Sequence, residues 1–340
     1  MRISVALATW NGERFLRAQL DSLLAQTYLP HEVVVSDDGS TDGTLAILEE
    51  FRARAPFPVL IRANQKRRGY AENFLRAAAA CGGDFIAFCD QDDVWLRSKL
   101  ARSAELLAAS GALLLIHRNA VVTEDLVRTR RRVPAFRHSS TAAPLQVQPW
   151  LLAPGNAMVF SRAVLDVDYS GRPRGLGQHG APMTHDEWTY FIATALGSTR
   201  FASEVLVYYR QHGGNVFGAP GRSPLRYTGA PDDYRFLAER ALDRSVFFEE
   251  LARSASFGSD RYQLAAAHYR TVAARLEARA SVYSPRAGMG QRFGRFAYLA
   301  ARGGYRSRMR GGFGLRSCLK DAIGSIALRS VQGLARRPRR

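Results

Sequence analysis

The sequence predicts an α/β fold in which a mostly parallel sheet carries helices on both faces. Three observations predict it. In the first 120 residues, short apolar runs alternate with segments whose apolar residues recur every three or four positions. These runs are apolar at consecutive positions, which is typical of strands buried on both faces. The composition, with 46% hydrophobic and 23% charged residues, is that of a globular protein and excludes fibrous and wholly disordered classes.

The first half of the chain supplies four predicted strands and the helices between them. We expect strands over residues 3–8, 32–36, 58–62 and 84–89, and helices over 13–26, 44–54 and 71–80. Pro56 and Pro58 end the second helix, since proline cannot continue a helix, and Gly82 and Gly83 end the third. Strands that alternate with helices form βαβ units, so a parallel sheet is expected here.

The second half continues with mixed signals and then becomes helical. A strand is expected over residues 158–160, a helix opens at 184–188, and a further strand covers 204–209. Residues 232–282 have helical spacing, with a break at Gly258. We therefore expect an α/β domain over 1–225, divided near residue 120, then a C-terminal helical extension over 226–283 and a tail over 284–340.

The chain is strongly basic, and its charge is unevenly placed. It has 48 Lys and Arg against 30 Asp and Glu, a net charge of +18. Residues 284–340 hold 14 basic residues and one acidic residue, interleaved with aromatic residues. This composition suits an anionic membrane surface, a nucleic acid or, for residues 336–340, a solvated terminus. We favour the membrane surface, because the rest of the chain is only mildly basic.

Cysteine content and hydropathy predict the compartment. Cys81, Cys89 and Cys318 are odd in number and lack CxxC spacing, which argues against a disulfide framework and a zinc site. No apolar run approaches the roughly 20 residues that span a bilayer, and polar residues interrupt the amino terminus too early for a signal peptide. We expect a cytoplasmic protein, peripheral at the inner face of the cell membrane.

Polar residues, most of them acidic, follow three of the predicted strands. Active sites of parallel sheets lie at the carboxyl ends of the strands, so these residues are expected to converge. A cluster of carboxylates repels itself unless a cation compensates it, and Mg²⁺ prefers such oxygens and is often shared with substrate phosphates. Taken singly, the segments also fit a solvated turn with a helix cap, or a surface acidic loop. The residues are Thr9 and Asn11, Asp37 and Asp38, and Asp90, Asp92 and Asp93.

The order and spacing of these segments resemble glycosyltransferase family 2. The matching stretches read SVALATWNGERF, EVVVSDDGSTDGT and DFIAFCDQDDVW, and the later YRQHGGN resembles the rhamnosyltransferase-like branch. The likeness covers residues 2–218, with a weaker echo over 298–324. It implies a Rossmann-like GT-A fold, with a nucleotide-sugar half over 1–120 and an acceptor half over 121–225.

The resemblance also implies roles for single residues around a nucleotide-sugar donor. One carboxylate of the Asp37–Asp38 pair accepts a hydrogen bond from the base, and which one is left open. The segment around Arg67 meets phosphate or is a solvated loop. The other implied donor contacts are Thr9, Asn11 and Glu13 beside the nucleotide, Asp90 near the ribose, Asp92 on a metal at the diphosphate, and Asp93, which orients the site.

Acceptor-side roles follow from the same resemblance. Asp186 matches the position whose carboxylate takes the proton from the acceptor hydroxyl, with Glu187 as the alternative base. On position alone, Asp186 equally fits a charge that stabilises a helix amino terminus. His212 either completes the metal coordination or binds the diphosphate, although an isolated histidine is more often structural.

The expected function is that of an inverting, metal-dependent glycosyltransferase. The resemblance implies a dTDP- or UDP-sugar donor, with dTDP-rhamnose favoured, Mg²⁺ or Mn²⁺ as the cofactor, and a cell-surface polysaccharide or lipid-linked glycan as the acceptor. Two other classes compete with it. One is a non-catalytic membrane-surface or nucleic-acid binding protein on a sugar-nucleotide fold. The other is a nucleotidyltransferase, which the absence of a glycine-rich GxGxR-type loop after the first strand disfavours.

Overall fold

The computed structural model describes residues 1–151, 153–177, 180–215, 231–255, 258–284, 287–305, 313 and 315–326. The chain divides into two compact units, each with its own internal packing. The first comprises Met1–Pro144, Leu151–Arg172 and Met183–Ser223, and the second comprises Leu145–Trp150, Pro173–Pro182 and Pro224–Arg340. Predictions for residues 226–230 and for the end of the tail, including 336–340, lie outside the described residues.

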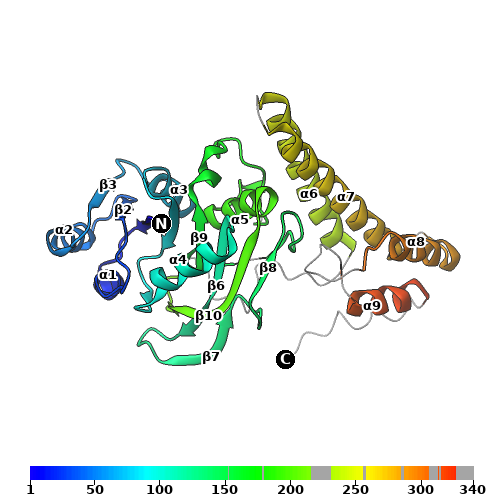
Figure 1. Cartoon of the computed structure of the whole chain (residues 1–340). Coiled ribbons are helices and arrows are strands. Elements are labelled where there is room, and N and C mark those ends of the chain that lie inside the picture. Colours follow the sequence, from blue (N-terminus) through cyan, green and yellow to red (C-terminus); the bar gives the residue numbers. More distant parts are fainter. Residues whose placement is uncertain are drawn as a thin grey trace. The chain divides into compact units, whose positions relative to one another are not determined.

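The first half of unit 1 is the predicted parallel sheet (Figure 1). Its strands lie in the order β3-β2-β1-β4, and each pairs with its neighbours in parallel. The strands β1 (Ile3–Thr9), β2 (Glu32–Asp37), β3 (Val59–Ala63) and β4 (Phe85–Cys89) agree with the predicted segments to within a residue or two. The helices between them are α1 (Glu13–Leu24), α2 (Thr44–Arg54) and α3 (Tyr70–Ala79).

The second half of the sheet is mixed in direction. Strand β9 (Met158–Ser161) lies between β4 and β6 (Leu114–Val122) and runs antiparallel to both. Strand β10 (Thr199–Arg210) pairs with β6 in parallel, and the short β5 (Val94–Trp95) closes that edge. Two further antiparallel strands, β7 (Arg128–Val133) and β8 (Ser140–Ala142), pair with β6 and β10.

Helices cover both faces of this sheet, as predicted. On one face, buried residues of α1, α2 and α4 (Lys99–Ser110) pack on alternate positions of β1 and β2 in one hydrophobic core. On the other face lie α3 and α5 (His185–Leu196), where the ring of Phe74 packs edge-on against Phe88 at 5.4 Å. Burial on both faces explains why β1 is apolar at consecutive positions and is buried over its whole length.

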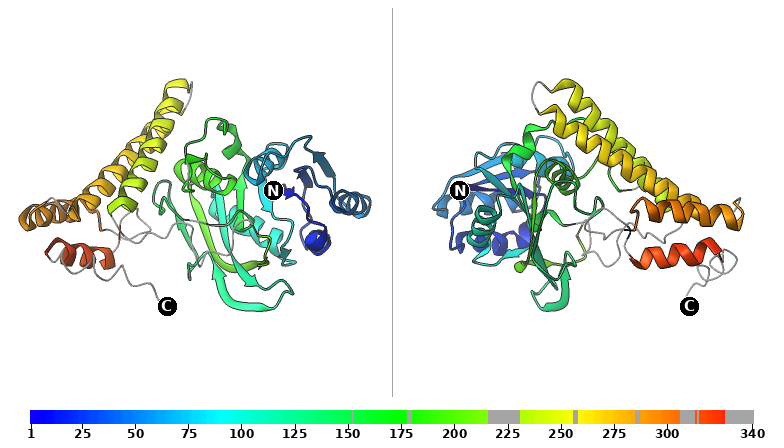
Figure 2. Two further views of the ribbon diagram at one scale, coloured as in Figure 1. Left: turned by 180° about the vertical axis from the view of Figure 1, so that it is seen from behind. Right: turned by 45° about the vertical axis from the view of Figure 1, so that its right-hand side comes forward.

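The described part of unit 2 is helical. Helices α6 (Pro231–Ser254) and α7 (Ser259–Val282) form a long antiparallel hairpin (Figure 2), followed by α8 (Met289–Ala301) and α9 (Leu315–Ile326). Asp321 of α9 is fully buried and accepts hydrogen bonds from Arg279 of α7 at 2.7 and 3.2 Å. Within the described residues, no helix combines the length and apolar character needed to cross a bilayer.

Candidate active site

The loops after β1 and β2 hold each other at the carboxyl edge of the sheet. Thr9 and Asp37 are paired in the parallel register, so the two loops leave the sheet side by side. Asn11, at φ +46°, accepts a hydrogen bond from the Thr41 amide at 2.8 Å, and Glu13 accepts one from the Gly43 amide at 2.9 Å. The side chains of Asn11 and Glu13 therefore brace the β2–α2 loop in this structure.

The two acidic residues at the end of β2 differ in how fully they are bonded. Asp37 is buried and accepts four hydrogen bonds, two on each oxygen; they come from the Thr9 hydroxyl, the Ser40 hydroxyl, and the amides of Gly39 and Ser40. These bonds close a turn, so every acceptor site of Asp37 is occupied within the loop.

Asp38 instead binds the segment of residues 64–69, which lies about 30 positions later in the chain. Its Oδ1 accepts from the Arg68 amide at 2.7 Å and from Asn64 at 3.1 Å, whereas, among the residues that the structure describes, its Oδ2 accepts only from the Gly69 amide, at 2.8 Å. Gly69 has φ +88°, a left-handed conformation that favours glycine. One acceptor position of Asp38 is therefore left over, and the carboxylate fixes the 64–69 segment beside it.

Trp10 and Arg67 meet above these loops. The Arg67 guanidinium lies 3.5 Å from the centre of the Trp10 ring, which is 40% exposed. The Gln91 side chain pairs with the Trp10 backbone in both directions, accepting from its amide at 2.8 Å and donating to its carbonyl at 3.1 Å. Gln91 stands between Asp90 and Asp92 in the sequence, and its side-chain amide joins the β1 loop to the β4 loop.

Three carboxylates from two distant segments lie close enough for their charges to interact. Asp90 follows β4, Asp92 lies two residues later, and Asp186 lies in the first turn of α5. Burial, and then the charges of Asp92 and Asp186, raise the pKa of Asp90 to about 8. Within the described residues, the Asp90 carboxylate accepts no hydrogen bond. A half-buried acid with acidic neighbours and no donor is the arrangement that a bound cation would stabilise.

His212 is held against Asp92. Its Nε2 lies 2.8 Å from Asp92 Oδ2, and its Nδ1 accepts a hydrogen bond from the Gly214 amide at 3.1 Å. An Nδ1 that accepts leaves the proton on Nε2, which therefore donates to Asp92. The ring also packs against Phe15 in a tilted arrangement, with centres 4.5 Å apart. In this arrangement both ring nitrogens of His212, which was predicted on a metal or the diphosphate, are hydrogen-bonded within the protein.

Asp93 belongs to a buried polar network that sequence reasoning missed. It accepts hydrogen bonds from Asn156 and from the Arg210 amide, and burial together with Asp92 and Asp90 raises its pKa well above the usual range. Lys99 is fully buried and donates to the Asn156 carbonyl at 2.7 Å, and burial lowers its pKa to about 7. Lys99 thus holds Asn156, and Asn156 in turn holds Asp93 in the loop after β4. Because no helix was predicted over residues 99–110, the sequence held no signal that Lys99 is buried.

Asp186 is positioned by the start of α5. Thr184 caps the helix in a capping box with Glu187, and the Thr184 hydroxyl and Glu187 amide both donate to Asp186 Oδ1. Asp186 Oδ2 accepts no hydrogen bond within the described part of the chain. The Glu187 carboxylate accepts from the Thr184 amide at 3.0 Å, so it has a structural role in the cap.

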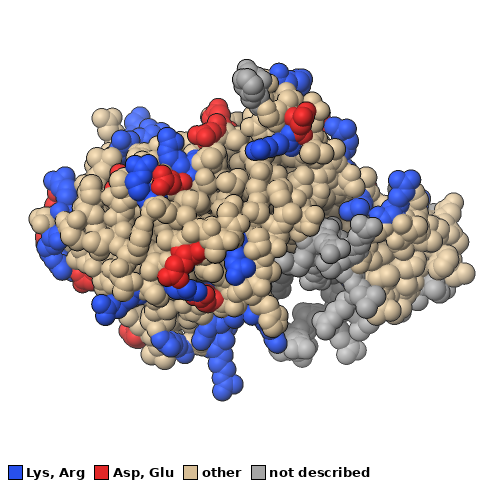
Figure 3. Space-filling view, in the orientation of Figure 1, with Lys and Arg blue, Asp and Glu red and all other residues tan. Residues whose placement is uncertain are grey.

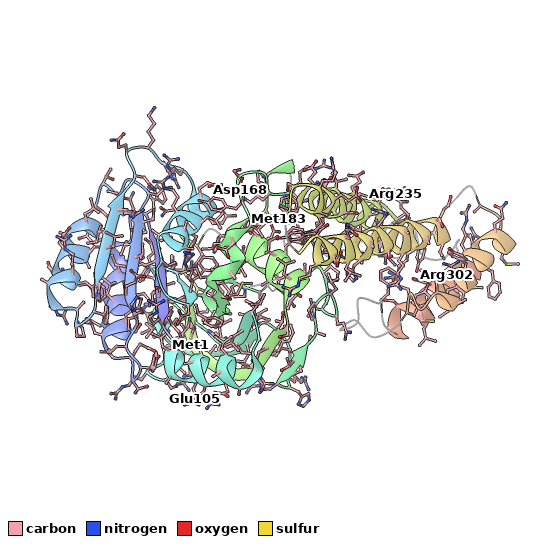
Figure 4. The ribbon with its side chains drawn as sticks, turned by 45° about the horizontal axis from the view of Figure 1, so that its top comes forward. Met1, Glu105, Asp168, Met183, Arg235 and Arg302 are labelled. Carbon is pink, nitrogen blue, oxygen red and sulfur yellow. The ribbon has the colours of Figure 1, made fainter. Side chains whose placement is uncertain are left out.

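The neighbour of Asp186 is buried in an aromatic box. The His185 ring stacks on Phe74 at 4.0 Å and meets Phe88 edge-on at 4.9 Å. Met183, labelled in Figure 4, is fully buried directly before this helix. The two ring contacts of His185 fix the first turn of α5 and therefore the direction of Asp186.

The residues present fit a divalent cation, although no preformed site exists. Within the described residues, no three His, Cys, Asp or Glu side chains are grouped as a metal site. Asp90 and Asp92 Oδ1 nevertheless present carboxylate oxygens without donors, which are the ligands that Mg²⁺ and Mn²⁺ prefer. With two protein carboxylates, a cation would need further oxygens from water or from a substrate.

Comparison with known proteins shows which family this chain is similar to. Residues 4–167 match the sequence profile described as glycosyl transferase family 2. This part of the chain is thus similar to a glycosyl transferase family 2 domain. The matched range contains every acidic strand-end residue described above, whereas Asp186 and His212 lie beyond it.

Relatives and solved structures agree with this assignment. An uncharacterized glycosyltransferase of Nostoc sp. is 28% identical over 221 residues, covering 63% of this chain and 66% of the relative. A dTDP-rhamnosyl transferase of Shigella flexneri is 34% identical over 110 residues, covering 31% and 38%. The chain thus matches less than two thirds of the length of these relatives. The crystal structure of S. aureus TarS 1-349 in complex with UDP-GlcNAc superposes with a TM-score of 0.56 at 19% identity, covering 98% of this chain and 92% of that one. The fold is therefore of the GT-A type.

Proposed function

We propose that this protein is an inverting glycosyltransferase that moves a sugar, with dTDP-rhamnose as the favoured donor, onto a hydroxyl of a polysaccharide or lipid-linked glycan. The observation that carries the proposal is the convergence of Asp90, Asp92 and Asp186 from two distant segments at the carboxyl edge of the sheet. The partial identity with a dTDP-rhamnosyl transferase supports the choice of donor.

For the nucleotide, we assign the base contact to Asp38. Asp37 has no acceptor position left, whereas Asp38 Oδ2 accepts one hydrogen bond and can accept another from a ring N–H. Thr9, Asn11 and Glu13 then act indirectly, because they shape the loops that border the nucleotide. Arg67 lies over Trp10 and is the cation of this segment placed to meet a phosphate.

For the diphosphate, Asp90 and Asp92 would hold Mg²⁺ or Mn²⁺. When bound, the cation stabilises the negative charge that develops on the leaving diphosphate. His212 and Asn215 both donate to Asp92 Oδ2, at 2.8 and 3.2 Å, and leave Oδ1 directed elsewhere. We therefore assign His212 to positioning Asp92, and Asp93 to anchoring the loop through Asn156 and Arg210.

For the acceptor, Asp186 would act as the general base. Its Oδ1 is held by the helix cap, and its Oδ2 is open to take the proton from the acceptor hydroxyl. The hydroxyl oxygen then bonds to the sugar C1 while the bond from C1 to the diphosphate breaks. Attack from the side opposite the leaving group inverts the configuration at C1.

The experiment is a transfer and binding assay with a series of dTDP- and UDP-sugars and Mn²⁺. Asp92→Asn is expected to weaken metal-dependent donor binding and lower transfer by a factor of at least about 100, whereas Asp186→Asn keeps donor binding and loses transfer by about 100 to 10,000. The exposed Asp125→Asn is the matched control. Full transfer by Asp186→Asn would move the base elsewhere, and no nucleotide-sugar binding by the native protein would favour a non-catalytic surface-binding protein.

We also propose that the basic tail holds the enzyme at the inner face of the membrane. In the described part of α8 and α9, Phe293, Leu319 and Ile323 are at least half exposed, among basic residues that include Arg302, labelled in Figure 4. Cutting the chain at Ser284 would leave buried Arg279 without its carboxylate, so exposed charges are the better target. Replacing Arg295, Arg302 and Lys320 by Gln should weaken binding to anionic vesicles, and unchanged binding would contradict this role.

A further inference from the structure

A second basic surface lies on unit 1, on the hairpin formed by β6 and β7. The segment 118–138 contains six arginines and two acidic residues, a local net charge of +4. Figure 3 shows blue side chains projecting along the lower edge of the molecule, where β7 lies in Figure 1. We call this surface the arginine hairpin and define it by Arg118, Arg128, Arg130 and Arg132 with the turn residues Leu126 and Val127.

The register of the hairpin places three of these arginines on one face. Arg132 pairs with Ala120 and Arg128 pairs with Val122, two positions further along β6, so Arg128 and Arg132 share a face, while Val133 points to the other and is buried. Arg130 lies in the irregular register between these two pairs. Arg132 is paired with Ala120 across the ladder, which puts Arg118 of β6 on the same face. Arginines about 7 Å apart along a strand repel one another unless anions lie between them.

These arginines have no ion-pair partner among the carboxylates that the structure describes. Within the described residues, Arg118, Arg128, Arg130 and Arg132 form no ion pair. Three arginines on α1 and α2 do form ion pairs: Arg17 with Glu50, Arg52 with Glu49 and Arg54 with Asp21. Burial, and then the charges of Arg132 and Arg137, lower the pKa of Arg118. Of the two acidic residues in the segment, Glu124 is paired with Arg14.

The hairpin also exposes apolar and aromatic surface. Val127 is 63% exposed and Leu126 38% exposed at the turn between the strands. Arg128 lies over the half-buried Tyr208 ring, 4.6 Å from its centre. Exposed aliphatic residues at a tip, flanked by arginines and a tyrosine, match the chemistry of the interface of an anionic bilayer.

We propose that the arginine hairpin is a docking surface for anionic lipid headgroups, separate from the basic tail. The hairpin leads back to the candidate active site, because the Arg210 side chain donates to the Glu124 carbonyl at 2.6 Å and to the Asp92 carbonyl at 2.7 Å. Docking there would bring the carboxyl edge of the sheet close to a bilayer. The proposal does not depend on sugar transfer, since its test reads lipid binding alone.

A simpler explanation of the arginines is protection of an edge strand. Charged residues on an edge strand prevent pairing with another chain. That role predicts aggregation after their removal, with unchanged vesicle binding by the monomer that remains. The docking proposal predicts a monomer that binds vesicles less.

The experiment compares two triple variants of the full chain. Arg128→Gln/Arg130→Gln/Arg132→Gln changes the hairpin, and Arg52→Gln/Arg54→Gln/Arg76→Gln makes the same charge change on α2 and α3. Binding is measured by co-sedimentation with phosphatidylcholine vesicles with and without phosphatidylglycerol, after gel filtration and circular dichroism have confirmed folded monomers. Val127→Ser, with exposed Leu60→Ser as its control, tests the apolar tip separately and without any charge change.

We expect the hairpin variant to lose at least about tenfold in partitioning onto the anionic vesicles, since each basic residue at such a surface contributes about fivefold. The control variant should lose no more than about twofold, and Val127→Ser should lose more than Leu60→Ser. Equal losses by both triple variants would reduce the effect to net charge and overturn the proposal. Loss of binding to a DNA duplex with vesicle binding unchanged would overturn it too, and would identify the partner as nucleic acid.

Discussion

His185 shows how a single buried residue sets the behaviour of the site. It is enclosed by Phe74, Phe88 and Tyr70, and burial lowers its pKa to about 4. In the unfolded chain a histidine has a pKa near 6.5. Between these values the unfolded state binds the proton and the folded state does not, so stability is present above pH 6.5 and is lost as the pH falls toward 4.

His185→Gln should therefore flatten the acid dependence of stability. The slope of the free energy of unfolding against pH, measured in urea between pH 4.5 and 6, should fall by up to one proton, or about 1.4 kcal/mol per pH unit. The variant is expected to be less stable at pH 7, because it leaves the aromatic box poorly filled, but the slope is a separate quantity. Replacing exposed His31 by Gln should leave the slope unchanged, and an unaltered slope in both variants would contradict the assignment.

At the scale of elements, the turn before β9 and the start of α5 fit closely together. Gly155 lies in the 3₁₀ turn η1 (Gly155–Ala157), and a Cβ added to it would lie 2.6 Å from His185 Nε2. The His185 ring cannot yield easily, because Phe74 and Phe88 pack against it. The glycine is thus required for close approach of η1 to the helix that carries Asp186.

Gly155→Ala is expected to destabilise the protein by about 1–3 kcal/mol through overpacking. It should also lower transfer while leaving donor binding unchanged, since the displaced helix carries the proposed base. Gly171→Ala is the control, because a Cβ there meets nothing within 4 Å. Chemical denaturation and transfer assays of both variants check the prediction, and equal stability of the two would refute the close contact.

Elements also show why the sequence predicted one half of the sheet better than the other. The alternation of β1, α1, β2 and α2 is local, so periodicity and the flanking glycines and prolines were sufficient to place them. The strand β9 was predicted as a strand, but its insertion between β4 and β6 was not, because pairing between distant segments leaves no local pattern. Helix α4 was missed, and its buried Lys99 breaks the apolar stripe that would have indicated it.

At the scale of the whole molecule, a buried charge pair joins α7 and α9 of unit 2. Asp321 accepts hydrogen bonds from Arg279 and from the hydroxyls of Tyr283 and Tyr305. The Arg279 guanidinium also lies over the rings of Tyr234 and Phe313, at 4.5 and 4.4 Å. The tail is therefore partly built into the helical unit, which its basic composition alone did not predict.

Asp321→Asn should leave Arg279 as an uncompensated buried charge and destabilise unit 2 by about 3–5 kcal/mol. Faster tryptic cleavage within α8, at Arg292 and Arg295, is the expected readout, with nucleotide-sugar binding by unit 1 retained. Exposed Asp260→Asn on α7 serves as the control. Identical cleavage rates in the two variants would show that the pair is not needed to hold α8 and α9.

By itself, the sequence determined the α/β class, the parallel half of the sheet and the likeness to glycosyl transferase family 2, because these depend on periodicity and on acidic residues at fixed distances from strand ends. Only the tertiary structure decided which of those residues have hydrogen-bonding positions left for a ligand. It saturated Asp37 with hydrogen bonds and left Asp38 a free acceptor position, and it turned His212 toward Asp92. It also placed Arg128 and Arg132 of β7 on the same face as Arg118 of β6. Each of these outcomes depends on which donors and charges lie nearby in space, and the order of residues along a chain does not specify that.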